Sequence, residues 1–271
     1  MDGICVFVLK SLPQAVDLVN SPESFETVKV DARLMLNEAA QYSVDLRDVH
    51  RQQAAKRALE VACAGGHNIL FIGPPGAGKT MLAKRIPTIL PPMSLEEAIE
   101  TTRIHSVAGT LERSQGLIGT RLFRSPHHTM IQRYVSKISG PLLDRIDIHI
   151  EVPAVKYEEL RAPSSSEDSA AVRGRVIAAQ ERQLRRFKEE KKTYCNAQMA
   201  PKLIRKYCAI SPEGEKPLEN AVTRLGLSAR AHDRILKVAR TIADLDASEN
   251  IQSKHLSEAI QYRTLDRSYW S

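Results

Sequence analysis

The residues of this chain that could do chemistry are concentrated in one short stretch, GPPGAGKT, at positions 73–80. The stretch fits the pattern G-x-x-x-x-G-K-[ST], in which glycines let backbone N–H groups turn inward around phosphate oxygens. In this pattern Lys79 reaches the β- and γ-phosphates of a nucleotide, and the Thr80 hydroxyl holds Mg²⁺. The predicted phosphate loop consists of Gly73, Pro74, Pro75, Gly76, Ala77, Gly78, Lys79 and Thr80.

The segments on either side of this loop predict the elements that it needs. The apolar run NILFI at 68–72 leads into it as a strand, and KTMLAKRI continues from it as a helix that Pro87 ends. Between residues 45 and 64 apolar side chains recur every three or four positions, which predicts a helix that the glycine pair at 65–66 stops. This context favours a nucleotide site over a chance Gly/Pro turn, which would not require Lys79 and Thr80 together.

The rest of the chain divides into a mixed part and a helical part. Ser94 and Glu97 form a capping-box pattern, which predicts a helix that begins there. The run IDIHIEV at 146–152 alternates as a strand does. The polar stretch APSSSEDS at 162–169 is the predicted linker. After it the sequence predicts helices at about 168–192, 198–209, 215–225, 228–245 and 253–264.

Composition excludes few classes of protein. The chain has 271 residues, with 39 basic and 32 acidic side chains and a formal net charge of +7. A basic balance suits a polyanionic partner, but the mixed charges of ERQLRRFKEEKK are more typical of a solvated helix face than of a DNA-binding patch. Four scattered cysteines form no C-x-x-C pair, so reduced thiols are expected. The apolar run at 4–9 is too short to span a membrane, and a cytoplasmic protein without a membrane partner is expected.

Several longer motifs resemble a known family. They are DLRDVHRQQAAKRALEVACAGGHNILFIGPPGAGKTMLAKRIPTILPP at 45–92, FRSPHHT at 123–129, QRYVSKISGPLLDRIDIHIEVPAV at 132–155, LSARAHDRILKVARTIADLD at 227–246 and HLSEAIQYRTLDR at 255–267. Together they resemble the ComM/YifB family of magnesium-chelatase-like AAA+ ATPases, and the resemblance covers most of residues 10–267.

This resemblance implies an α/β fold, namely a P-loop AAA+ three-layer core followed by an all-α lid. The implied domains are a remnant of an N-terminal domain and linker at 1–45, a truncated core at 46–155 and the lid at 156–271. Family members are ATP-driven motors that form homo-oligomeric rings (hexamers), and their best-described role is DNA branch migration during natural transformation. The implied cofactors are ATP and Mg²⁺, and the implied partners are further copies of the chain and DNA.

The resemblance also assigns roles to two arginines. Arg145, in LLDRID, matches the arginine finger that reaches the γ-phosphate held by a neighbouring subunit. Arg230, in LSAR, matches a lid arginine that senses nucleotide within its own subunit, and Arg234 is the alternative one helical turn along. Apart from the resemblance, each would be an ordinary surface charge. The family has glycine before Gln52, where this chain has Arg51, and this difference could alter how adenine packs.

One essential part of a P-loop ATPase is missing from the sequence. Such enzymes need a short apolar run that ends in Asp-Glu, which holds Mg²⁺ through water and activates the attacking water. Asp144 follows only two apolar residues, and Asp147 precedes isoleucine rather than a carboxylate. In the family a long segment with the acidic strand, the sensor strand, a pore-facing insert and a Cys-rich loop separates SPHHT from MIQRYVSKISG, but here Thr129 and Met130 are adjacent. The large N-terminal Lon-protease-like domain of the family is also expected to be absent.

This deletion has a structural cost and leaves the function open. Loss of two inner strands would leave the strand before the phosphate loop with one neighbour and one open edge, while the helical lid should survive better because its contacts are local. Three alternatives therefore remain. The chain is a ComM-type ring motor, a nucleotide-binding regulatory subunit that does not hydrolyse ATP, or a deletion product with little function of its own.

Overall fold

The computed structural model describes residues 5–27, 34, 36, 39–111, 116–124, 145–154 and 166–263. The chain forms two compact units, Met1–Gln41 with Pro92–Arg121, and Tyr42–Pro91 with Leu122–Ser271. The junction between Thr129 and Met130 lies outside the described residues. The three-domain division expected from the sequence stays a prediction. In the part of the chain that is described, no helix is both long and apolar enough to cross a membrane.

The first unit contains helices α1 (Leu12–Asn20) and α6 (Leu95–Val107). The capping box predicted for α6 is confirmed, because the Ser94 hydroxyl accepts from the Glu97 N–H at 3.1 Å and the Glu97 carboxylate accepts from the Ser94 N–H at 2.9 Å. Arg121 forms an ion pair with the same carboxylate at 2.9 Å, and the Ile118 N–H donates to Thr102 on α6. These contacts hold the segment after α6 against the helix.

The second unit contains a parallel sheet of two strands, β1 (Ile69–Ile72) and β2 (Ile148–Glu151), among the described residues. The register runs from Ile69 opposite Ile148 to Ile72 opposite Glu151. This agrees with the truncated parallel sheet expected from the sequence. The four residues of β1 are only half-buried, whereas β2 begins with two buried residues. The β2 residue His149 also donates its N–H to the Tyr262 carbonyl at 2.9 Å, so the C-terminal segment borders β2.

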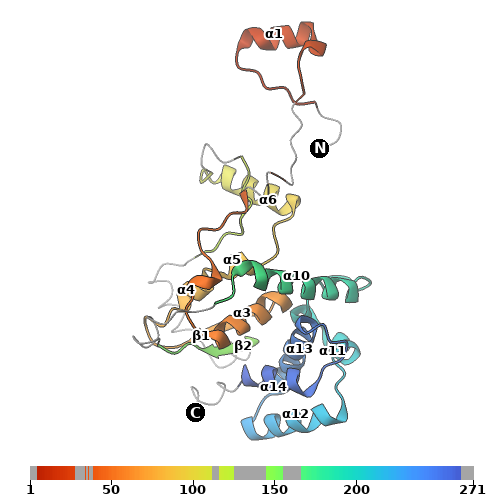
Figure 1. Cartoon of the computed structure of the whole chain (residues 1–271). Coiled ribbons are helices and arrows are strands. Elements are labelled where there is room, and N and C mark those ends of the chain that lie inside the picture. The colour runs from red at the N-terminus through yellow and green to blue at the C-terminus, as the bar shows by residue number, and fades with distance from the viewer. Residues whose placement is uncertain are drawn as a thin grey trace. The chain divides into compact units, whose positions relative to one another are not determined.

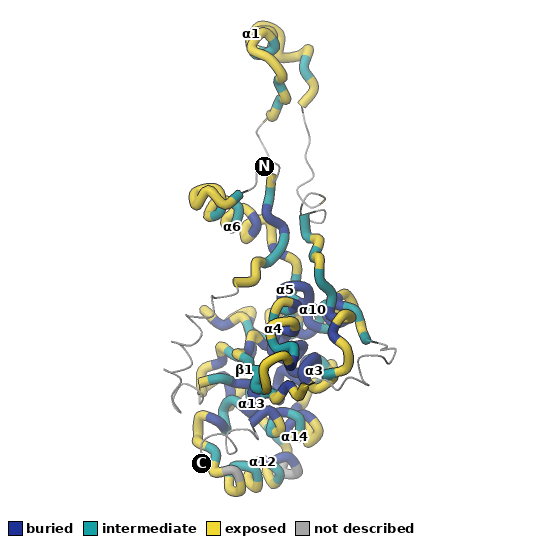
Figure 2. Tube along the Cα trace, turned by 90° about the vertical axis from the view of Figure 1, so that its left-hand side faces the viewer, coloured by how far each residue is buried: buried dark blue, intermediate teal, exposed yellow. Residues whose placement is uncertain are grey.

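Helices make up most of the second unit (Figure 1). The central helix α3 (Gln53–Gly65) packs on α10 (Ser169–Arg186), on α13 (Ala229–Leu245) and on β2. The helix α13 packs in turn on α11 (Pro201–Tyr207) and α14 (Ser253–Gln261), and α14 contacts α12 (Pro212–Leu225). Buried residues are concentrated where α3, α10 and α13 meet (Figure 2). The apolar stripe predicted on the 228–245 segment is thus confirmed as core packing.

Two local predictions were wrong, and both have a backbone explanation. The segment 45–64 is not one helix. It forms a short 3-10 turn at Leu46–Asp48, and α3 begins only at Gln53. Arg51 and Gln52 have φ angles of 55° and 47°, and two successive left-handed residues cannot continue a right-handed helix.

The helix after the phosphate loop is shorter than predicted. It splits into α4 (Lys79–Ala83) and α5 (Ile86–Ile89). Pro87 does not end a helix but lies in the first turn of α5. Proline is favoured there because its fixed φ suits the helix and the N–H that it lacks would have no partner within the helix.

Candidate phosphate-binding site

The loop at residues 73–80 joins the carboxyl end of β1 to α4. Glycine suits three positions of this loop, for different structural reasons. Gly76 and Gly78 have φ angles of 81° and 86°, in the left-handed region that glycine enters without a steric penalty. Gly73 lies against the end of β2, where a Cβ atom would stand 2.2 Å from the Val152 carbonyl oxygen. The two glycines that the sequence motif requires are therefore explained by close approach at Gly73 and by backbone conformation at Gly78, and Gly76, at a variable position of the motif, is also left-handed.

The Lys79 side chain folds back over the loop. Its Nζ atom donates to the carbonyl oxygens of Gly73 and Pro74, at 2.8 Å each. This places the ammonium group beside the loop, as phosphate binding would require. Thr80, the predicted Mg²⁺ contact, is exposed at the start of α4. Among the described residues, no three His, Cys, Asp or Glu side chains are grouped to hold a metal by themselves.

A glutamine from the segment before α3 supports the loop. The Gln52 Nε2 atom donates to the carbonyl oxygen of Ala77 at 2.8 Å, and Ala77 is buried. The Oε1 atom of Gln52 is buried without a hydrogen-bond partner among the described residues. The sequence placed Gln52 near the nucleotide only through the family resemblance. Its contact with the loop has no local sequence signal, because the two positions are 25 residues apart.

The arginine-finger candidate lies at the other end of the strands. The strands are parallel, the phosphate loop follows β1, and Arg145 comes three residues before β2 begins. A four-residue strand spans roughly 13 Å. The exposed Arg145 is therefore separated from the phosphate loop of its own chain by at least the length of the sheet. The structure does not bring these two predicted site elements together within one chain.

Arg230 and Arg234, the two arginines that the resemblance offers as nucleotide sensors, differ in their surroundings. Arg230 is exposed in the first turn of α13, whereas Arg234 forms an ion pair with the buried carboxylate of Asp147. The Asn68 N–H donates to the same carboxylate at 3.1 Å, and His67 Nδ1 lies 3.7 Å from it, which is an ion-pair distance rather than a hydrogen bond. Asp147 immediately precedes β2, so Arg234 is engaged at the end of the sheet opposite the phosphate loop.

These contacts set the protonation state of Asp147. Burial alone would raise its pKa, but His67, the Asn68 N–H and the Arg234 guanidinium outweigh burial and lower the pKa to about 2. Asp147 is therefore a structural anion that holds α13 to the sheet. The sequence gives Asp147 no neighbouring carboxylate, and its position at the end of the sheet opposite the phosphate loop likewise does not fit the role of the missing acidic pair. Asp144, which follows too short an apolar run in the sequence, lies outside the described residues.

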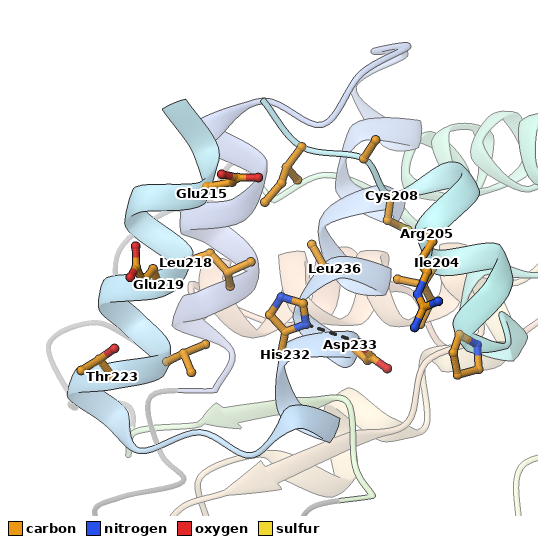
Figure 3. Close-up of a pocket in the computed structure, with 14 residues that line it drawn as sticks. Ile204, Arg205, Cys208, Glu215, Leu218, Glu219, Thr223, His232, Asp233 and Leu236 are labelled. Carbon is orange, nitrogen blue, oxygen red and sulfur yellow. Dashed lines mark hydrogen bonds and ion pairs between the residues drawn. The ribbon is translucent and has the colours of Figure 1, made fainter. Parts of the chain in front are cut away.

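A groove in the helical region lies between α11, α12 and α13 (Figure 3). Its volume is about 860 Å³, and Ile204, Leu218 and Leu236 contribute apolar surface. Acidic residues of α12 stand on one side of the groove and Arg205 of α11 on the other (Figure 3). No residue of the phosphate loop lines it, so the groove and the loop are separate features.

Comparisons with known proteins assign the chain to a family. A family model described as magnesium chelatase, subunit ChlI, matches residues 45–132 and again 129–160, and one described as magnesium chelatase, subunit ChlI C-terminal, matches residues 166–263. The first model matches in two pieces that meet at 129–132. This is where the sequence indicates a deleted segment.

Three curated proteins are similar over most of the chain. Protein YifB of Salmonella typhimurium is 34% identical over 316 residues, which cover 83% of this chain and 61% of that protein. Protein YifB of Escherichia coli is 34% identical over 314 residues, with 82% and 61% covered. Competence protein ComM of Haemophilus influenzae is 31% identical over 356 residues, with 96% and 68% covered.

The lengths of these matches show how much of each relative corresponds to this chain. The chain spans about 61% of the two YifB proteins. Each match is also longer than the 271 residues of the chain itself. The matched part of each relative therefore includes a stretch that has no counterpart here, in agreement with an internal deletion.

Proposed function

Because the chain belongs to the ComM/YifB family of magnesium-chelatase-like AAA+ proteins, we propose that residues 73–80 bind ATP together with Mg²⁺. The observation that carries the proposal is the geometry of the loop, in which two left-handed glycines, a glycine packed against β2 and the Lys79 ammonium group all meet the requirements of a phosphate site. The residues present thus fit the cofactor.

In this site Lys79 would exchange two neutral carbonyl acceptors for charged phosphate oxygens. Charge-assisted hydrogen bonds are about twice as strong as neutral ones, so the exchange favours binding. The Thr80 hydroxyl would hold Mg²⁺, and the bound nucleotide would supply the phosphoanhydride. Gln52 would keep the loop in place through its bond to Ala77.

The test is the binding of labelled ATP or ADP to the chain and to Lys79→Ala. Loss of the charged contacts should remove about 1.5–3 kcal/mol per bond, a loss of tenfold or more in affinity. Lys84→Ala is the matched control, because Lys84 is exposed one turn further along the chain and is not part of the motif. Equal affinity of Lys79→Ala and Lys84→Ala would rule out this site.

We further propose that ATP hydrolysis by this chain stays at background. The acidic pair is absent from the sequence, and Asp147 is held by Arg234 at the wrong end of the sheet. Arg145 cannot replace the pair, because a guanidinium stabilises charge but accepts no proton. Its place at the other end of the strands supports action on a neighbouring subunit only, as in an arginine finger.

An ATPase assay with and without single-stranded or branched DNA tests this second proposal. Rates should remain at background in both. A DNA-stimulated rate of about 1 s⁻¹ that disappears in Arg145→Ala would contradict the proposal and show a working ring. In that case Glu151→Gln would test whether Glu151 supplies the missing carboxylate. Glu151 is exposed and pairs in register with Ile72, the residue before the loop.

We propose the wider role of the chain from its family resemblance. The family resemblance implies ATP-driven DNA branch migration during natural transformation within a homo-oligomeric ring, and similarity to a relative named as a competence protein supports this role. The missing acidic pair favours a different role for the chain on its own, as a nucleotide-binding regulatory subunit or as a deletion product without activity. Light scattering with and without ATP measures the molecular mass and so distinguishes the motor from the alternatives. A motor requires a nucleotide-dependent ring, and the alternatives do not.

A further inference from the structure

The groove between α11, α12 and α13 is lined like a helix bundle from which one helix is missing. Leu218 and Val222 of α12 line one side of it, and Ile204 of α11 and Cys208 at the end of α11 line the other. Leu236 of α13 lies between these two pairs (Figure 3). Residues four apart share one face of a helix, so α11 and α12 direct a helical face at the same space.

The helix α12 does not close this space. It packs on α14, which packs in turn on α13, whereas its contacts with α11 and α13 are sparse among the described residues. A volume of about 860 Å³ thus remains between α12 and the other two helices. The lining residues Pro201, Ala209 and Thr223 are exposed, so a partner can enter the groove from solvent without unfolding the chain.

The lining of the groove carries an excess of negative charge, although the chain has a formal charge of +7. It holds the carboxylates of Glu215, Glu219 and Asp233 against one guanidinium, that of Arg205 on the opposite side (Figure 3). Asp233 lies 3.4 Å from its neighbour His232. Glu215, Glu219 and Arg205 are exposed, and none of them has an ion-pair partner among the described residues.

We propose that this groove binds an amphipathic helix of a partner protein, which has an apolar ridge and carries lysine or arginine side chains along the edge that faces α12. The unpaired carboxylates of Glu215 and Glu219 favour basic groups on that edge, and Arg205 disfavours them on the other. Lys216 of α12 does not line the groove and pairs with neither carboxylate. Burial of an apolar helix face in a groove between helices is a common mode of peptide recognition.

The test uses the full chain without nucleotide, so its outcome does not depend on the phosphate loop. The probe is a synthetic helical peptide of leucine and lysine with the 14 residues of α12, which span roughly 21 Å, and its leucines form one ridge. Fluorescence anisotropy of the labelled peptide should show saturable binding that weakens as sodium chloride is added, because salt screens exposed charges. A peptide of the same composition, scrambled so that no ridge forms, should bind about fivefold more weakly or less.

Two double variants of the chain locate the binding. Glu215→Gln with Glu219→Gln should weaken the affinity about fivefold or more, the size expected for two exposed charge contacts. Glu181→Gln with Glu189→Gln is the matched control, because it makes the same change in net charge outside the groove and should leave the affinity unchanged. All four positions are exposed, so neither double variant should disturb folding.

Each contrary result overturns the proposal in a different way. Equal binding of the ridged and scrambled peptides would show that the groove only attracts cations. Equal effects of the two double variants, or no saturable binding at all, would show that the peptide does not occupy the groove. Light scattering of the chain alone completes the test, since self-association that Glu215→Gln with Glu219→Gln abolishes would identify a second copy as the occupant instead.

Discussion

The contact between Asp147 and Arg234 makes a quantitative prediction, because it links the sheet to the helical part of the second unit. In Asp147→Asn the Arg234 guanidinium loses its carboxylate partner. The side chain of Asp147 is 5% exposed, so solvent screens this interaction little. We therefore expect the substitution to lower the free energy of unfolding at neutral pH.

The pKa of Asp147 gives the magnitude. It falls from the ordinary value of 3.8 to about 2 in the folded chain. Each unit of difference corresponds to about 1.4 kcal/mol, so the ionised carboxylate contributes roughly 2 kcal/mol. Because the folded pKa is the lower one, this contribution is complete above pH 3.8 and is lost as the pH falls through 2. The difference between wild type and Asp147→Asn should shrink in the same window.

Urea unfolding at several pH values between 7 and 2.5 measures this difference. Glu181→Gln is the control, because Glu181 is exposed on α10 and its removal should change stability by less than about 0.5 kcal/mol at any pH. Arg234→Met should cost stability as Asp147→Asn does, without weakening ATP binding. A stability difference that stays constant from pH 7 to 2.5 would refute the assignment of Asp147 as a charged structural anchor.

Three further predictions follow from the backbone and the thiols. Arg51→Gly should raise the free energy of unfolding by roughly 0.5–1 kcal/mol in a urea titration, because a φ of 55° strains an arginine but not a glycine. A loss of stability would mean that contacts of the arginine side chain outweigh the strain. Gly73→Ala should lower the melting temperature clearly more than Gly76→Ala does, because only at the first position would the new Cβ meet a backbone carbonyl, at 2.2 Å. Burial raises the pKa of Cys63 and of Cys208 to about 12, so neither thiol should react with a thiol reagent at pH 8 until urea unfolds the chain, and fast labelling of either would contradict its burial.

Sequence patterns that span only a few residues correctly predicted where helices begin and end. The glycine pair predicts the end of α3, and Gly66 does adopt the left-handed conformation, with φ of 68°, after the last helical residue. The capping box of α6 needs only Ser94 and Glu97, which lie three residues apart. Both devices depend on local backbone geometry, so the residue types alone were enough to predict them.

Features that depend on tertiary contacts could not be predicted from the sequence. Nothing in the sequence near Arg234 indicates that it pairs with Asp147, because the two are 87 positions apart. The break before α3 was missed for a related reason. The apolar periodicity of residues 45–64 continues through the break, since Leu46 and Val49 are buried in the core although they precede the helix. Periodicity reports burial, and it reports helical geometry only where the chain stays regular.

The distribution of burial suggests how this chain can keep a phosphate loop with only part of a sheet. The described neighbour of β1 in the sheet is β2, and all four residues of β1 are half-buried, so the sheet by itself provides little core. The helices α3 and α13, in contrast, carry long runs of buried residues, and α3 packs on both β2 and α13. The loop is fixed at two points, by the bond from Gln52, which precedes α3, and by the close packing of Gly73 on Val152, which follows β2. Binding of a nucleotide needs only that the loop keep its shape, and these two contacts provide that. Hydrolysis needs in addition an acidic strand beside the loop, and that strand is the kind of element that the deletion removes. Loss of the strand should therefore separate the two activities, and a chain that binds ATP without hydrolysing it is the expected result.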